Sequence, residues 1–290
     1  MKIALLHSAE AGDSVSPEIL RQAVEGAGHR LVGLFEPHID IEAVRACSPE
    51  LVVAAGGDGI VWRAATVVHG RDIPLAIVPL GTANNVATSL GVAGGLDDLA
   101  AGWHSAERRP IDLGLLRGAR GESRFLEGVG GGLVARAINA LSRRGGQEPI
   151  DPDARITGAL RRYREILAEM TPAPVSLSLD GQPIDGEFLL VEALNIRAVG
   201  PNLVLAPAAD PSDGQLEVVM ALEEHRGEID RYLRRRGEGR DGPLELPTRR
   251  ARTVEVDGWG EMHIDDEARL GSSMGTVSLT VEPGALCVLV

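Results

Sequence analysis

Residues 51–59 read Leu-Val-Val-Ala-Ala-Gly-Gly-Asp-Gly, an apolar run that breaks into glycines around one carboxylate. Residues 75–85, Leu-Ala-Ile-Val-Pro-Leu-Gly-Thr-Ala-Asn-Asn, form a second apolar run that ends in a polar loop. Such runs, bounded by turn residues, are typical of buried parallel strands. Helix-compatible segments follow at 60–68 and 84–90, so bare N–H groups and positive helix ends should converge at one sheet edge. Open α/β sheets bind ligands at that edge.

The flanking sequence continues the same alternation of strand and helix. Strands are predicted at residues 2–7 and 30–35, and helices at 17–27, 39–46 and 96–105. This order predicts an α/β domain over residues 1–107 with a doubly wound, mostly parallel sheet.

From residue 108 the chain changes to short strands separated by turn signals. Asp180-Gly181, Asp185-Gly186 and Asp213-Gly214 are typical hairpin dipeptides. We predict a mostly antiparallel β-sandwich domain over 108–290, with helices at 153–170 and 224–236, whose last strand could cross back to the first domain. The predicted strands are 111–116, 124–129, 175–179, 187–196, 216–222, 252–256, 261–264, 276–281 and 286–290.

Charge and composition exclude several classes of protein. The net charge of −13 argues against nucleic-acid binding, which needs clustered basic surface. No stretch approaches the roughly 20 apolar residues of a membrane span, so a cytoplasmic location is expected. Cys47 and Cys287 stand far apart, which indicates reduced thiols. Because Lys2 is the only lysine, any phosphate chemistry must use backbone donors, arginine and metal.

The two loops favour a phosphate site more strongly together than either does alone. Glycines after a strand often only make a tight turn, but Asp58 among N–H donors suits a phosphate that Mg²⁺ bridges. Thr82, Asn84 and Asn85 offer short hydrogen-bonding side chains to ribose and phosphate oxygens. The alternative for this second loop is an ordinary helix cap, with Thr82 or Asn84 at the N-cap.

Residues 53–59, followed by residues 79–85, resemble the diacylglycerol kinase catalytic domain of bacterial lipid kinases, which is related in fold to NAD kinases and 6-phosphofructokinases. Further segments match in order: 111–114, 125–132, 205–208 with 213–216, and 264–267 with 281–286. The resemblance implies an N-terminal α/β nucleotide domain, a C-terminal β-sandwich that binds the acceptor, and an active site in the cleft between them.

The resemblance also assigns roles to single residues. Asp58 would organise a catalytic Mg²⁺, Asp265 would be the general base for the acceptor hydroxyl, and Glu267 would assist it. Without the resemblance, Asp265-Asp266 is predicted to be a hairpin turn. The residues implied to bind ATP are Gly56, Gly57, Asp58, Gly59, Ile60, Val61, Trp62, Arg63, Gly81, Thr82, Asn84 and Asn85.

Two further segments have both a functional and a structural interpretation. Asp213, with the backbone carbonyls of Asp210 and Gln215, matches a structural Mg²⁺ site in some members of the family, but an Asp-Gly turn explains these residues equally well. Gly130-Gly131-Gly132 could form an anion nest or the floor of a cleft, or a close-packed corner between strand and helix.

The chain departs from the family pattern at several positions. Ile60 replaces a Thr, Trp62-Arg63 replace Asn-Glu, Asn85 replaces an Asp, and Asp266 replaces a Gly. Glu127 stands where many members carry Asn, and Val134 stands near a position where many members carry Asp. The lost hydroxyl and carboxylates weaken the expected phosphate and metal contacts, although Arg63 could act as a phosphate clamp.

The leading hypothesis is an ATP- and Mg²⁺-dependent kinase that phosphorylates a hydroxyl of a lipid-like or other small acceptor. One alternative is an NAD-kinase-like activity, against which residues 79–85 argue, and another is a catalytically weak lipid- or nucleotide-binding protein. The arginine-rich runs 161–164 and 234–240 could give transient contact with a membrane surface, although solvated helix faces are favoured. A homodimer is a further partner hypothesis.

Overall fold

The structure is a computed structural model, which describes residues 1–8, 15–36, 38, 40–143, 151–240, 242–270 and 275–290. The chain forms two compact units: unit 1 comprises Met1–Ile111 and Gly284–Val290, and unit 2 comprises Asp112–Pro283. The chain leaves unit 1 within β5 (Arg108–Gly118) and returns within β18 (Val277–Leu289). The sequence places this boundary at residue 107.

Unit 1 is built on a parallel sheet in the order β2-β1-β3-β4. The end of β18 continues the sheet, with Val288 beside Leu75 in parallel register. All six residues of β3 are buried, which requires cover on both faces of the sheet. The strands are β1 (Lys2–His7), β2 (Arg30–Phe35), β3 (Leu51–Gly56) and β4 (Leu75–Pro79).

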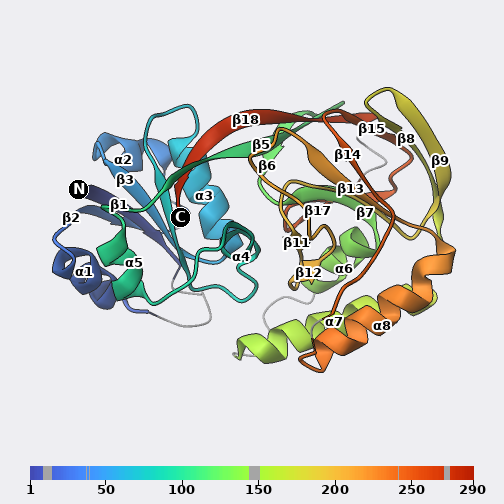
Figure 1. Cartoon of the computed structure of the whole chain (residues 1–290), viewed down its shortest axis with the longest axis horizontal. Coiled ribbons are helices and arrows are strands. Elements are labelled where there is room, and N and C mark those ends of the chain that lie inside the picture. The colour runs from blue at the N-terminus through green and yellow to red at the C-terminus, as the bar shows by residue number, and fades with distance from the viewer. Residues whose placement is uncertain (9–14, 37, 39, 144–150, 241, 271–274) are drawn as a thin grey trace. The chain divides into compact units, whose positions relative to one another are not determined.

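Helices cover this sheet, as the alternating sequence predicts (Figure 1). Alternate strand residues, such as Ile3 and Leu5, pack in one core with residues of α1 and α5. Helix α3 packs on β1, β3 and β4 and contacts α2 and α4. The helices are α1 (Pro17–Gly26), α2 (Ile41–Ala46), α3 (Asp58–Val68), α4 (Asn85–Leu90) and α5 (Leu96–Gly102).

Unit 2 is a sandwich of antiparallel strands. One layer is a six-stranded sheet in the order β14-β13-β10-β7-β16-β17, and the other contains β15, β8 and β9 beside the first part of β18, with the β5–β6 hairpin. One core holds inward residues of both layers, such as Ile264 and Leu177. The remaining strands are β6 (Gly121–Phe125), β7 (Gly128–Gly132), β8 (Ala173–Leu179), β9 (Gln182–Phe188), β10 (Leu190–Leu194), β13 (Leu216–Ala221), β14 (Thr248–Ala251), β15 (Val254–Asp257), β16 (Glu261–Ile264) and β17 (Glu267–Leu270).

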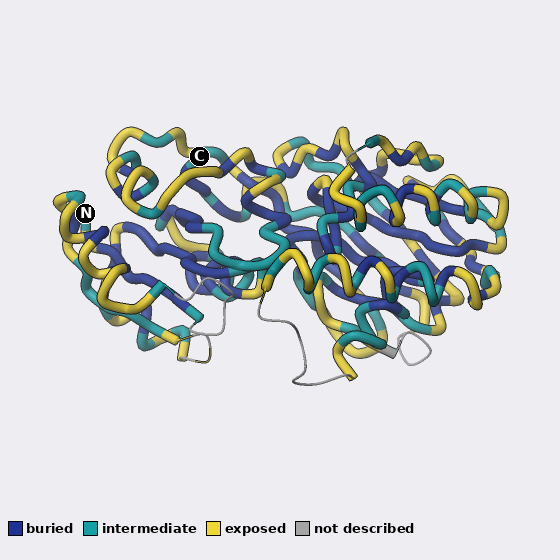
Figure 2. Tube along the Cα trace, turned by 90° about the horizontal axis from the view of Figure 1, so that it is seen from below, coloured by how far each residue is buried: buried dark blue, intermediate teal, exposed yellow. Residues whose placement is uncertain are grey.

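Helices α6 (Leu133–Ser142), α7 (Pro152–Glu169) and α8 (Arg226–Gly237) form a second core with the six-stranded sheet. Helices α7 and α8 contact each other along their length (Figure 1). The short elements β11 (Ala198–Val199), β12 (Leu203–Val204) and the 3-10 turn Glu223–His225 complete this unit. Strand segments are mostly buried, whereas exposed residues gather on helices and loops (Figure 2). Among the described residues, no helix has the length and apolar character needed to cross a membrane.

Four sequence predictions about strands are wrong. Segment 124–129 is interrupted at Leu126 and Glu127, which separate β6 from β7, and segment 187–196 is interrupted at Leu189. The two predicted C-terminal strands are one strand, β18, in which Gly284 has a φ of +60°. Asp185-Gly186 lies inside β9 and makes no turn. Local turn propensity is overridden here by pairing with neighbouring strands.

Candidate active site

The two glycine-containing loops of unit 1 meet backbone to backbone. The ends of β3 and β4 are in register, with Gly56 beside Pro79, and the Leu80 N–H donates to the Gly56 carbonyl at 3.1 Å. A Cβ on Gly57 would lie 3.3 Å from the Cα of Gly81, and a Cβ on Gly81 would lie 2.9 Å from the nitrogen of Gly57. This contact confirms that the two loops converge at the carboxyl edge of the sheet.

Asp58 joins the two loops through its carboxylate. It begins α3, and its two oxygens accept from the backbone N–H groups of Asn85 and Val86, each at 3.0 Å. These N–H groups belong to the first turn of α4 and have no partner within that helix. Asp58 therefore caps α4 from the other loop and places its negative charge at the N-termini of both helices.

Asn84 fixes the shape of the second loop. Its backbone is left-handed, with a φ of +51°, and it occupies the N-cap position of α4. The side chain bonds Gly81 twice, because Oδ1 accepts from the Gly81 N–H at 2.9 Å and Nδ2 donates to the Gly81 carbonyl at 2.8 Å. The predicted position of the helix cap is correct, but Asp58 supplies the capping oxygens and Thr82 lies within the loop.

The start of α3 carries the residues that depart most from the family pattern. Ile60 is buried and packs on Gly56, where an added Cβ would meet its Cγ1 at 2.6 Å. The N–H groups of Ile60 and Val61 donate to the Gly57 carbonyl at 3.0 and 3.2 Å. Both residues thus build the helix, while Trp62 and Arg63 are half-buried on its next turn. The first N–H groups of α3 belong to residues 58–59.

In unit 2, Asp265 lies in a two-residue turn between β16 and β17, where Ile264 pairs with Glu267. The predicted hairpin turn is correct, and the turn also aims its carboxylate at the interruption between β6 and β7. Oδ1 accepts from the N–H groups of Leu126 at 3.2 Å, Glu127 at 2.8 Å and Gly128 at 3.1 Å, and Oδ2 accepts from Leu126 at 3.1 Å.

These contacts distinguish the two carboxylate oxygens of Asp265. Oδ1 is saturated by its N–H donors, whereas Oδ2 shares a single donor and keeps lone-pair capacity for a proton. Burial raises the pKa of Asp265 to about 6, although hydrogen bonds from the three backbone N–H groups act in the opposite direction. A carboxylate with this pKa suits general base catalysis near neutral pH. The side chain of Glu267 is 64% exposed and pairs with Arg269.

The predicted structural Mg²⁺ site is occupied by protein groups. Oδ1 of Asp213 accepts from the Gln215 N–H at 2.9 Å, and Oδ2 pairs with the guanidinium of Arg250. The Asp210 carboxylate accepts from the N–H and hydroxyl of Ser212, and its carbonyl accepts from the Asp213 N–H at 3.3 Å. A cation at Asp213 would therefore have to compete with the Arg250 guanidinium for the carboxylate. Throughout the described ranges, no cluster of three or more His, Cys, Asp or Glu side chains could hold a metal.

Arg250 gives a direct test of this conclusion. The melting temperature of the wild-type protein without nucleotide is expected to be insensitive to millimolar Mg²⁺, because Arg250 already neutralises Asp213. Arg250→Ala should melt at a lower temperature and recover part of the loss when Mg²⁺ is added. Differential scanning fluorimetry measures both effects, with Asp213→Asn as the control. A Mg²⁺ response in the wild type that disappears in Asp213→Asn would restore the metal hypothesis.

The glycine run at the end of β7 is the close-packed corner that the sequence allowed. A Cβ on Gly130 would overlap the Glu192 carboxylate, and one on Gly131 would lie 2.5 Å from Nε1 of Trp259. Gly132 has a φ of +84° and lies against the carbonyl of Leu189. Each glycine therefore makes room for a different neighbour, so packing explains all three.

Sequence analysis did not single out two residues, Asp112 and Asn195, that support the segments around Gly214 and Leu126. Asp112 is buried, and its Oδ2 accepts from the Gly214 N–H at 2.7 Å. The Asn195 side chain donates to the carbonyls of Asp112 and Leu126, both at 3.0 Å. Asp112 lies in a segment that matches the family, which was a usable signal, whereas Asn195 reaches partners too distant in sequence for any pattern to show.

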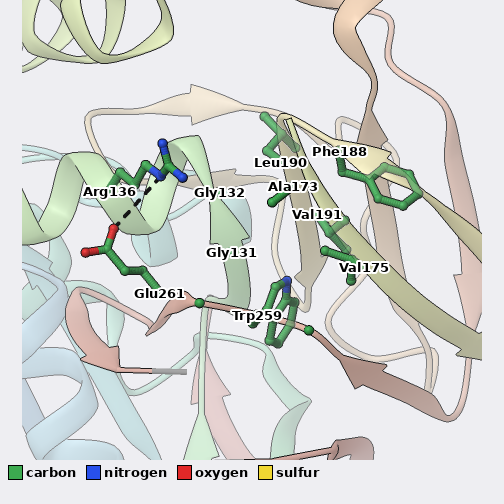
Figure 3. A pocket seen from close by; sticks show the side chains of 12 residues that line it. Gly131, Gly132, Arg136, Ala173, Val175, Phe188, Leu190, Val191, Trp259 and Glu261 are labelled. Carbon is green, nitrogen blue, oxygen red and sulfur yellow. Dashed lines mark ion pairs between the residues drawn. The ribbon is translucent and has the colours of Figure 1, made fainter. Parts of the chain in front are cut away.

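Unit 2 contains an apolar cavity of about 70 Å³ (Figure 3). Phe188, Val191 and Trp259 line it, and Gly131 forms part of its wall. Arg136 and Glu261 stand at one side, with Nε and Oε2 separated by 4.0 Å. The cavity could hold a short section of an alkyl chain, with the charged pair beside it.

The arginine-rich runs are largely engaged within the fold. Arg161 and Arg162 pair with Glu165 at 3.2 and 3.1 Å. Arg235 and Arg236 donate to the carbonyls of Pro243 and Asn202 at 3.1 and 3.0 Å, respectively. These contacts support the interpretation of the runs as structural, solvated helix faces.

Comparison with known proteins identifies the family. The model for the diacylglycerol kinase catalytic domain matches residues 10–116, and that for the YegS C-terminal NAD kinase beta sandwich-like domain matches residues 150–290. A diacylglycerol kinase of Mycobacterium tuberculosis (strain ATCC 25618 / H37Rv) is 30% identical over 275 residues, which cover 88% of this chain and 85% of the relative. The chain therefore belongs to the diacylglycerol kinase catalytic domain family, as the sequence resemblance predicts.

Two further comparisons agree with this assignment. A probable lipid kinase, YegS-like, of Pseudomonas aeruginosa (strain UCBPP-PA14) is 33% identical over 181 residues, or 61% of this chain and 56% of the relative. The crystal structure of a putative diacylglycerol kinase from Bacillus anthracis str. Sterne superposes with a TM-score of 0.72 at 18% identity, and covers 99% of this chain and 94% of that one. The structural match shows the common fold: an α/β domain and an antiparallel β-sandwich.

Proposed function

We propose that this protein is a lipid kinase that transfers the γ-phosphoryl group of ATP to a hydroxyl of a lipid-like acceptor such as diacylglycerol. The observation that carries the proposal is the backbone contact of Gly57 with Gly81, which brings two strand-end loops together at one sheet edge. Membership of a kinase family supports the same conclusion.

The nucleotide phosphates would lie over these loops. N–H groups at the start of α3 are suited to phosphate oxygens, and Arg63 on the next turn is the nearby permanent cation in a chain whose only lysine is Lys2. When bound, Mg²⁺ would neutralise charge on the phosphates. Asp58 would hold it, since its carboxylate joins the two loops over which the phosphates would lie and carboxylate oxygens are the ligands that Mg²⁺ prefers.

Asp265 would act on the acceptor. Oδ2 takes the hydroxyl proton while the acceptor oxygen forms a bond to the γ-phosphorus, and the bond from phosphorus to the ADP oxygen breaks in line. The three N–H donors hold the carboxylate still, so its geometry is set before the acceptor binds. Positioning and charge neutralisation supply most of the catalysis in such reactions.

A lipid-like acceptor is supported by the names of the relatives and by the apolar cavity lined by Phe188, Val191 and Trp259. Incubation of the purified protein with Mg²⁺ and γ-labelled ATP should give labelled phosphatidic acid from dioleoylglycerol in mixed micelles. A sphingoid base and NAD are the comparison acceptors. Phosphorylation of NAD alone would favour the NAD-kinase-like alternative and contradict this proposal.

A catalytically weak binding protein is the second candidate. The buried Ile60 and buried Asn85 stand where the family carries a hydroxyl and a carboxylate, and both therefore favour this alternative. Tight ATP binding without label transfer to any acceptor would establish it.

We also predict that binding to anionic membranes is weak and sensitive to salt. Arginines near an anionic surface contribute about 1 kcal/mol each before screening, but several in the two runs are already paired, as Arg164 is with Asp230 at 2.7 Å. Sedimentation with vesicles of graded phosphatidylserine content should show binding at low ionic strength that falls at physiological ionic strength. Tight binding to neutral vesicles that ignores salt would instead indicate a hydrophobic anchor.

A further inference from the structure

Two buried side chains, Glu192 and His263, meet across strand β7 of the six-stranded sheet, next to the turn that holds Asp265. Gly130 of β7 is in register with Glu192 of β10 on one side and with His263 of β16 on the other. The two side chains meet over Gly130, with His263 Nε2 at 2.7 Å from Glu192 Oε2. A Cβ on Gly130 would overlap the carboxylate, so the glycine is what allows the contact.

The stability of the sheet does not explain this pair. Both side chains are 0% exposed, and burial of an ion pair generally costs more than apolar side chains of similar volume. Within the described part of the chain, the second oxygen of Glu192 and the hydroxyl of Tyr163 are also buried without hydrogen-bond partners. A buried polar pair that lowers the stability of the fold points to a role in positioning a neighbouring group.

The other nitrogen of His263 reaches the candidate base. Nδ1 lies 2.7 Å from the backbone carbonyl of Asp265 and must donate, because a carbonyl oxygen can only accept. Asp265 has a φ of +51°, a left-handed conformation that is unfavourable for a residue with a Cβ. The turn is thus held at its carbonyl by His263 and at its carboxylate by Leu126, Glu127 and Gly128.

We propose that Glu192 and His263 are positioning residues, which hold Asp265 in its left-handed turn so that Oδ2 faces the acceptor hydroxyl. This inference rests on the function proposed above. Neither side chain touches substrate. Glu192 fixes the rotation of the imidazole, the imidazole fixes the carbonyl of Asp265, and the N–H groups at the interruption between β6 and β7 fix its carboxylate.

The charges around the pair agree with this role. Burial acts to lower the pKa of His263, but the Glu192 carboxylate and the contacts with Asp265 outweigh it, so the pKa of His263 is raised. Burial also raises the pKa of Glu192, against the opposing effect of His263. The titratable groups that interact with the pair are Asp265 and Asp266 from the turn and Tyr163 from α7. A positive ring beside Asp265 favours its carboxylate form.

Two variants separate positioning from simple support of the fold. The double substitution Glu192→Leu/His263→Leu replaces the pair by apolar side chains and should leave the melting temperature at or above that of the wild type. The turnover number kcat on dioleoylglycerol should nevertheless fall by about 10- to 100-fold, the effect of a misplaced catalytic group. The KM for ATP should stay within about twofold, since the nucleotide loops are untouched.

Glu192→Gln tests the charge with almost no change of shape. Loss of the carboxylate should lower the pKa of His263, and the neutral ring can still donate from Nδ1, so kcat at high pH should stay within a few fold of the wild type. The acid limb of the pH profile should move to higher pH, because Asp265 loses the neighbouring positive charge. The matched control is His29→Leu, which removes another buried histidine that contacts a carbonyl, that of Ala100 at 2.9 Å, and should leave the profile unchanged.

The outcomes distinguish this inference from the proposed function. If Asp265→Asn is inactive while the double variant and Glu192→Gln both keep wild-type kcat and pH profiles, the pair is merely structural and the inference is overturned. If the double variant fails to fold, the pH profile of Glu192→Gln decides alone. If Asp265→Asn is fully active, the proposed base itself is wrong, and there is nothing for the pair to position.

Discussion

A Gly57→Val variant is expected to fold and to lose ATP binding by about 100-fold or more, which corresponds to about 2.7 kcal/mol. A Cβ at this position already lies 3.3 Å from the Cα of Gly81, so the valine methyl groups must push the two loops apart or fill the space expected for a phosphate. The valine side chain would also shield the N–H donors at the start of α3 from a phosphate.

Isothermal titration calorimetry with Mg·ATP measures the loss. Gly158→Ala is the matched control, because an added Cβ there meets nothing within 4 Å and the residue lies within α7, away from both glycine loops. The control should bind ATP normally and melt at the same temperature or higher, since alanine is the better helix former. Wild-type affinity for Mg·ATP in a correctly folded Gly57→Val protein would contradict the assignment of this loop as the nucleotide site.

Asp265→Asn is expected to lower kcat by on the order of 10² to 10⁴ while the KM for ATP changes little. The amide oxygen can still accept hydrogen bonds from the N–H groups of Leu126, Glu127 and Gly128, so the turn should persist. The amide cannot, however, take the proton of the acceptor hydroxyl. In the wild type, activity should rise as pH increases through about 6, because Asp265 must lose its proton to act as a base. Steady-state kinetics over a pH series provides the test.

The same substitution has an opposite effect on stability. Because the pKa of Asp265 is raised on folding to about 6, ionisation between its ordinary value and pH 6 disfavours the folded state. The neutral amide avoids this cost, so Asp265→Asn should melt no lower than the wild type at pH 7. A large fall in melting temperature together with full activity would identify Asp265 as a turn residue and nothing more.

Sequence patterns predicted the parts of the fold whose signals are local. The apolar runs that end at Gly56 and Pro79 give the parallel sheet, and the loops after them meet as their positions at strand ends require. Asp265-Asp266 is the hairpin turn that its composition predicts. These features depend on neighbours within a few residues.

The remaining features depend on contacts that no local pattern contains. Asp58 caps α4 across 27 positions of sequence, and His263 reaches Glu192 across 71. Strand β7, almost all glycine, has a composition unfavourable for a strand, yet it lies inside the six-stranded sheet because its neighbours need its bare surface. Likewise, Arg250 pairs with Asp213, for which the sequence left a Mg²⁺ site implied by the family resemblance and an Asp-Gly turn as equal alternatives.

The return of β18 to unit 1 has a consequence for synthesis on the ribosome. Residues 284–290 complete the first unit, where Leu289 joins the core and Val290 exchanges backbone hydrogen bonds with Glu107 at 3.1 and 3.0 Å. The two glycine loops emerge early, but the sheet that carries them cannot be finished until these residues have been translated. A chain released before residue 284 would therefore carry both glycine loops on an incomplete sheet, and ribosome-bound intermediates should acquire protease resistance in unit 1 only after unit 2 has emerged.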